Sequence, residues 1–168
     1  KRLPSRPTSR YPLRGRPRGD STRSLRRGEV MTKVLMYETD DAFAGEVRAQ
    51  LDQAGWSMEI CRWGAAALAA AASVRPDVIV VRAELSDVDG FSVCSLLKGD
   101  PHFAATPVVV VARYAGSEAL EQHARSPSRA DEYLCEPLTA AALVARLQQH
   151  VNGAYSQRAD DPSVTITN

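Results

Sequence analysis

Long apolar runs and clustered cysteines or histidines are missing from this sequence of 168 residues. No stretch approaches the roughly 18 apolar residues that a membrane-spanning helix needs, so we expect no membrane segment. Cys61, Cys94 and Cys135 stand far apart in apolar stretches, which predicts buried thiols rather than a metal site. We therefore expect no bound metal, no cofactor, and a reducing, cytoplasmic location.

Charge is distributed unevenly along the chain. Residues 1–30 contain ten basic and two acidic residues, a net charge of +8, whereas residues 31–168 contain eleven basic and eighteen acidic residues, a net charge of −7. Frequent Pro and Gly predict that residues 1–31 form a disordered basic extension. This arm lacks interleaved aromatic side chains, so we do not expect nucleic acid as a partner. The polar residues 152–168 predict a disordered tail.

Strand-like and helix-like patterns alternate five times between these ends. Short apolar runs predict strands at residues 34–37, 58–60, 78–81, 107–111 and 133–135. Capping residues, apolar spacing and alanine content predict helices at residues 40–55, 65–72, 90–97, 117–125 and 139–151. Five such units indicate an α/β domain over residues 32–151, with a doubly wound parallel sheet and helices on both faces.

Four sequence motifs point to a particular family. They read K-V-L-M-Y-E-T-D-D, P-D-V-I-V-V-R-A-E-L-S-D-V-D-G-F, T-P-V-V-V-V-A-R and A-D-E-Y-L-C-E-P-L. In this order and spacing, they resemble the receiver domain of bacterial response regulators. The resemblance covers residues 32–151 and implies a flavodoxin-like sheet with strand order 2-1-3-4-5.

Phosphoryl transfer in that family uses a metal-binding acid pair after the first strand and a nucleophilic aspartate ending the third strand. It also uses a hydroxyl ending the fourth strand and a lysine that precedes a proline after the fifth. The matching positions here form a degenerate pocket of Glu38, Thr39 with neighbouring Asp40, Arg82, Ala112, and Glu136 followed by Pro137. An arginine cannot accept a phosphoryl group, and an alanine cannot donate a hydrogen bond.

The resemblance therefore implies a non-phosphorylatable pseudo-receiver, not an enzyme, that binds a protein partner in a two-component or phosphorelay pathway. Its pocket keeps opposite charges, so Arg82 pairs with Glu136 or Glu38 in one interpretation and points to solvent in the other. By analogy with the family, the Glu136–Pro137 peptide bond is expected to be cis.

Two alternatives remain open. An active receiver would need Mg²⁺ and an unconventional acceptor such as Glu84, but Pro76-Asp77 and Asp89-Gly90 align the acceptor position with Arg82. A flavodoxin-type small-molecule domain would need a phosphate-binding loop after the first strand. The acidic run at residues 38–41 would repel phosphate instead.

Tyr133 occupies the position of an aromatic residue whose rotamer, in the family, reports phosphorylation to partners. This resemblance predicts a partner-binding face on the fourth helix, fifth strand and fifth helix, which would also suit a homodimer. The runs E-T-D, D-G-F, L-L-K-G-D and A-D-E-Y further resemble the pseudo-receiver of a motility protein of gliding myxobacteria.

Overall fold

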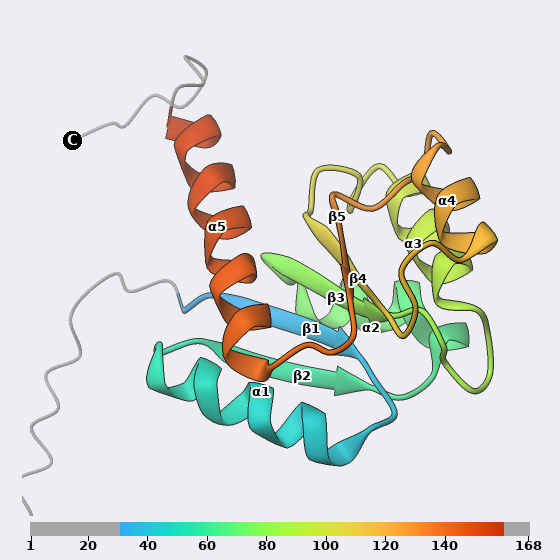
Figure 1. Ribbon diagram of the computed structural model, residues 1–168. Coiled ribbons are helices and arrows are strands. Elements are labelled where there is room, and N and C mark those ends of the chain that lie inside the picture. Colours follow the sequence, from blue (N-terminus) through green and yellow to red (C-terminus); the bar gives the residue numbers. More distant parts are fainter. Residues whose placement is uncertain (1–30, 160–168) are drawn as a thin grey trace, which may run out of the picture.

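Five parallel strands form one sheet in the order β2-β1-β3-β4-β5, as expected (Figure 1). The computed structural model describes residues 31–159, with side chains to residue 154. The strands are β1 (Lys33–Tyr37), β2 (Ser57–Cys61), β3 (Val78–Arg82), β4 (Val108–Ala112) and β5 (Glu132–Cys135). Every residue of β3 and β4 is buried, because both faces of these central strands are covered by helices.

Helices cover both faces of the sheet. They are α1 (Asp41–Gln53), α2 (Ala67–Val74) preceded by a 3₁₀ turn (Gly64–Ala66), α3 (Gly90–Gly99), α4 (Glu118–Ala124) and α5 (Ala140–Ala159). On one face, α1 and α5 contribute Leu51 and Leu147 to a core with β1 and β3 (Figure 1). On the other face, Ala71 of α2 and Leu97 of α3 pack on the opposite side chains of the same strands. The doubly wound architecture is therefore confirmed.

Short polar side chains begin most of these helices. Asp40 accepts the backbone N–H groups of the first turn of α1, and Asp89 and Ser117 do the same for α3 and α4. Thr139 accepts the N–H of Ala142 at the start of α5. Each of these bonds satisfies a backbone donor that has no partner inside its helix.

The fifth helix is longer than expected. It continues to Ala159, whereas the sequence predicts a disordered tail from residue 152. Extending an existing helix adds one hydrogen bond per residue without a new nucleation step, so polar residues can continue it. The rest of the predicted tail, residues 160–168, and the basic residues 1–30 lie outside the described residues.

No helix within residues 31–159 is both long enough and apolar enough to cross a lipid bilayer.

Candidate functional site

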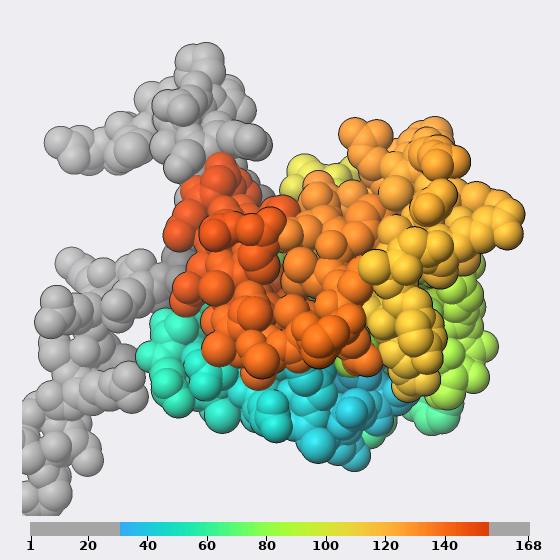
Figure 2. Space-filling model, in the orientation of Figure 1, coloured from blue at the N-terminus to red at the C-terminus, as the bar shows by residue number. Residues whose placement is uncertain are grey.

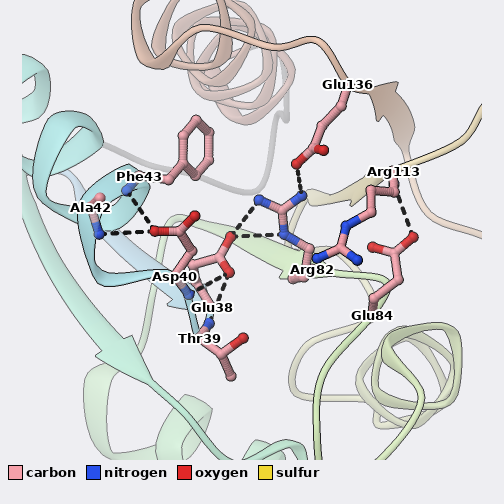
Figure 3. A network of polar contacts seen from close by, with 9 residues as sticks. All are labelled: Glu38, Thr39, Asp40, Ala42, Phe43, Arg82, Glu84, Arg113 and Glu136. Carbon is pink, nitrogen blue, oxygen red and sulfur yellow. Dashed lines mark hydrogen bonds and ion pairs between the residues drawn. The ribbon is translucent and has the colours of Figure 1, made fainter.

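Arg82 is the centre of a charge cluster at the carboxyl end of β3. Its guanidinium lies between the carboxylates of Glu38 and Glu136 (Figure 3). Nε and Nη2 are 2.9 and 2.8 Å from Oε2 of Glu38, and Nη1 is 2.5 Å from Oε1 of Glu136. Only 8% of the arginine side chain is exposed. Arg82 therefore does not point to solvent, and it pairs with both carboxylates rather than with one.

Glu38 is the buried side of this cluster. It follows β1, the strand next to β3, and its side chain is 2% exposed. While Oε2 faces the guanidinium, Oε1 accepts the backbone N–H groups of Thr39 at 2.8 Å and Asp40 at 3.0 Å. Both oxygens of this buried carboxylate thus accept hydrogen bonds, as a polar group with little access to water requires.

Glu136 is the outer side of the cluster. It follows β5, and 39% of its side chain is exposed. Its backbone N–H donates to the carbonyl of Ala112 at 3.0 Å, and the peptide bond to Pro137 is cis, as expected. The two carboxylates therefore hold the same cation from environments of very different solvent access.

Phe43 completes the cluster and was missed by the sequence reasoning. The centre of its ring lies 5.5 Å from Cζ of Arg82, within the range of a cation–π contact. Phe43 stands in the first turn of α1, three residues after Asp40, which brings it over the pocket. Phe43 also belongs to the apolar stripe of α1, and that spacing alone predicts a core residue.

Arg82 remains a cation in this setting. Burial lowers its pKa, but hydrogen bonds and charge interactions with Glu38 and Glu136 more than offset that effect and raise the pKa above its ordinary value. The site therefore presents a permanent positive charge at the carboxyl end of β3.

Glycine is required where the next helix begins. A Cβ on Gly90 would stand 2.1 Å from the carbonyl oxygen of Arg82, so only glycine allows the start of α3 to approach the end of β3 this closely. The backbone of Arg82 is held in place by this packing.

The other predicted pocket residues have different roles. Asp40 turns its carboxylate toward α1 and accepts the N–H groups of Ala42 and Phe43 at 2.9 and 3.1 Å (Figure 3). Ala112 is 2% exposed and offers only a methyl group at the end of β4. Glu84 accepts the backbone N–H of Arg113 at 2.9 Å. Ala112 therefore supplies no hydroxyl at the end of β4, and Glu136 supplies no amine after β5.

These residues do not fit Mg²⁺, the metal that the fold family implies. A hard cation needs several free anionic oxygens, whereas both oxygens of Glu38 and Oε1 of Glu136 already face a guanidinium or backbone amides. Within the described part of the chain, no three or more histidine, cysteine or acidic residues are grouped so as to hold a metal ion. No step of a reaction is therefore assigned to magnesium in this pocket.

Tyr133 lies apart from the charge cluster, on β5. It is half-buried, and its hydroxyl oxygen is 2.6 Å from Nδ1 of His123 in α4 and accepts the N–H of Ala130 at 3.0 Å. His123 belongs to no cluster of histidines in the sequence. The contact between α4 and β5 gives it a partner that sequence separation alone does not reveal.

The sheet order and the helices on both faces define a receiver-like α/β domain. The model of the response regulator receiver domain family matches residues 34–148. The chain belongs to this family.

Two curated relatives resemble this chain over only part of their own length. Adventurous-gliding motility protein Z of Myxococcus xanthus is 32% identical over 113 residues, which are 67% of this chain and 8% of that protein. The DNA-binding dual master transcriptional regulator RpaA of Synechocystis is 30% identical over 118 residues, 70% of this chain and 48% of that protein. The chain thus spans less than half the length of either relative, and the expected likeness to a myxobacterial motility protein is confirmed for the receiver part.

Solved structures agree on the fold. The signal receiver domain of a LuxO repressor protein from Vibrio parahaemolyticus has a TM-score of 0.69 at 16% sequence identity, covering 79% of this chain and 98% of that chain.

Proposed function

We propose that this receiver domain takes up no phosphoryl group and acts in two-component or phosphorelay signalling as a protein-binding module. The observation that carries this proposal is the Arg82 guanidinium, which is buried between Glu38 and Glu136 at the end of β3. A nucleophile that attacks phosphorus needs a lone pair, and a protonated guanidinium has none to offer.

The remaining pocket residues support the same proposal. Ala112 offers no hydroxyl to a phosphoryl oxygen, and Glu136 would repel the phosphoryl group that a lysine would attract. Binding of Mg²⁺ would require Glu38 to leave Arg82 and two backbone N–H groups. The internal cation thereby takes over the charge balance that the family assigns to an exchangeable metal.

Partner binding is proposed for the face formed by α4, β5 and α5. In Figure 2, the orange to red segments that include these elements form a continuous part of the surface. Glu132 of β5 pairs with Arg146 and contacts His150 of α5, so Arg146 balances its negative charge within this face. Arg125, the residue that follows α4, and Gln149 of α5 are both exposed. A protein partner is the proposed occupant, and a second copy of the chain is the alternative outcome.

Phosphorylation is tested by intact mass after incubation with Mg²⁺ and acetyl phosphate, with an active receiver domain as positive control. We expect no phosphoryl adduct on the natural protein or on Arg82→Asp, since the latter still lacks the hydroxyl and the lysine. An adduct that maps to Glu84 would contradict the proposal and support an active receiver with an unconventional acceptor.

Partner binding is tested by affinity capture with matched surface variants. Arg125→Glu combined with Gln149→Glu alters the proposed face, and Arg62→Glu combined with Gln53→Glu makes the same changes near α1. Loss of a captured protein in the first variant only is the expected result. Equal capture by both variants would remove this face from the proposal.

A further inference from the structure

A buried histidine lies directly behind the face that we assign to the partner. His123 of α4 is 8% exposed. Its Nδ1 is 2.6 Å from the hydroxyl oxygen of Tyr133 in β5, and its Nε2 is 3.1 Å from Oγ of Ser95 in α3. The imidazole also packs on the ring of Phe91, with 5.2 Å between the ring centres. The side chain of His123 thus connects α4 with both α3 and β5.

The hydrogen-bond partners indicate where the protons lie in this network of Tyr133, His123 and Ser95. The Tyr133 oxygen accepts the N–H of Ala130 and has a single proton to donate. We assign this proton to the bond with Nδ1 of His123, whose lone pair lies 2.6 Å from the phenol oxygen and accepts it. Nε2 then carries the imidazole proton and donates it to the hydroxyl of Ser95. With a neutral imidazole, both ring nitrogens of His123 and the hydroxyl of Tyr133 have hydrogen-bond partners.

The groups that surround His123 favour this neutral form. Burial lowers the pKa of His123, and the carboxylate of Asp89 and the carbonyl of Phe91, both in α3 or its cap, offset the effect only in part. Tyr133 faces it from β5 and keeps its own proton, because burial raises the pKa of that phenol.

The groups near Tyr133 complete this environment. Burial raises the pKa of the Cys94 thiol in α3 to about 12, so the thiol is uncharged at neutral pH. Arg129 and Asp131, on the segment before β5, carry opposite charges and act on the phenol in opposite directions.

We propose that His123 is a positioning residue for the partner-binding face: in its neutral form it holds Tyr133 in one orientation, and protonation releases Tyr133. The inference rests on the proposed function, because Tyr133 lies on the face assigned to the partner. An imidazolium carries hydrogens on both nitrogens, so the Nδ1–H and the phenol proton would meet as two donors. The phenol hydrogen, or one of the two rings, must then turn, so the hydrogen bond that Tyr133 donates to Nδ1 is lost. We expect Tyr133 to leave its position beside α4 as a result.

Through His123, the conformation of the partner-binding face depends on pH rather than on phosphorylation. Ala112 at the end of β4 has no hydroxyl that would link the degenerate pocket to Tyr133. The hydrogen bond from Tyr133 to His123 is instead independent of Arg82, Glu38 and Glu136. Its state depends on one titratable side chain in α4.

Three variants separate positioning from simple packing. His123→Asn places an amide oxygen near the position of Nδ1 and cannot be protonated, so it keeps the acceptor for the phenol. His123→Leu fills the space and removes the acceptor. Ser95→Ala removes the partner of Nε2 and leaves the bond to Tyr133, and therefore serves as the control.

The test is an NMR titration of protein with ¹³C-labelled tyrosine rings, in which the Tyr133 signal is assigned from Tyr133→Phe. We expect the Tyr133 signal to shift with pH at the midpoint of the His123 ring, below the ordinary histidine pKa of 6.5. His123→Asn should hold the signal at its neutral-pH position throughout, and His123→Leu should show the released position throughout. Ser95→Ala should retain the transition with a changed midpoint.

A Tyr133 signal that stays constant while His123 titrates would overturn the inference, as would equal signals in His123→Asn and His123→Leu. If His123→Leu does not fold, the natural protein and His123→Asn decide between the outcomes. These spectra need neither a phosphodonor nor a partner. A phosphoryl adduct would thus overturn the proposed function and leave the histidine result standing, and the reverse also holds.

Discussion

The interior of the sheet and its carboxyl edge depend on different physics. In the interior, Leu35, Val80 and Val110 are buried among apolar neighbours, and their stabilising contribution comes from burial and packing. At the edge, one residue further along β3 than Val81, Arg82 is buried among charges. Apolar runs thus specify the fold, whereas the single residue that ends each run specifies the charge and the chemical groups of the site. Measurements of stability can separate the two.

The largest effect is expected from breaking the buried ion pair. Glu38→Gln keeps an acceptor for the N–H groups of Thr39 and Asp40 but leaves the buried Arg82 with only the exposed carboxylate of Glu136. Removing one partner of a buried pair costs about 3–5 kcal/mol. Urea unfolding of the variant should show this loss. A change below about 1 kcal/mol would mean that solvent reaches the pair freely.

A smaller effect is expected when both buried charges are removed together. Arg82→Met combined with Glu38→Gln replaces an ion pair by uncharged groups of similar size, which is often nearly neutral for stability. The double variant should therefore be more stable than either single variant. Strict additivity in this double-mutant cycle would show that the two side chains do not interact.

The interior should respond to size rather than to charge. Ile79→Val, one strand position from the centre of β3, removes one fully buried methyl group and should cost about 0.5–1.5 kcal/mol. This loss should be the same at low and high salt. A strong dependence on salt would contradict the division between interior and edge.

The outer half of the cluster should contribute less. Glu136 is partly exposed, so Glu136→Gln should cost about 0–1 kcal/mol, and the loss should diminish as salt screens the pair. Unfolding at two salt concentrations checks both statements. A cost equal to that of Glu38→Gln would show that the two carboxylates are equivalent.

The weakest expected signal is a pH effect on β5. Burial raises the pKa of Glu132, but Arg146 and His150 more than offset it, so its pKa lies below the ordinary 4.5. The stability that Glu132 contributes is therefore present above pH 4.5 and lost as the pH falls through the depressed pKa. Glu132→Gln should flatten this part of the curve of stability against pH. If the variant loses as much stability at acidic pH as the natural protein does, Glu132 is not the group responsible for that loss.

The sequence predicts much of the fold because its signals are local. The apolar runs of β3 and β4, the caps Asp89 and Thr139, and the alternation of elements can all be recognised without tertiary contacts. The positions of Arg82 and Glu136 also follow, because parallel strands bring their carboxyl ends to one edge.

Other parts of the site depend on contacts that the sequence does not encode locally. Phe43 looks like a core residue until the start of α1 is placed over Arg82. The simultaneous pairing of Arg82 with two carboxylates depends on a rotamer, and the bond between His123 and Tyr133 depends on how α4 packs against β5. The extent of α5 depends on helix propagation beyond the last residue that packs in the core.

We propose that Arg82 fills the place of both the phosphoryl acceptor and the metal. A crystal structure of the protein soaked with Mg²⁺ and beryllofluoride tests it most directly. We expect the guanidinium of Arg82 to remain between Glu38 and Glu136, with neither species bound beside it. Density for a magnesium ion on Glu38 and for beryllofluoride on a neighbouring carboxylate would contradict this account.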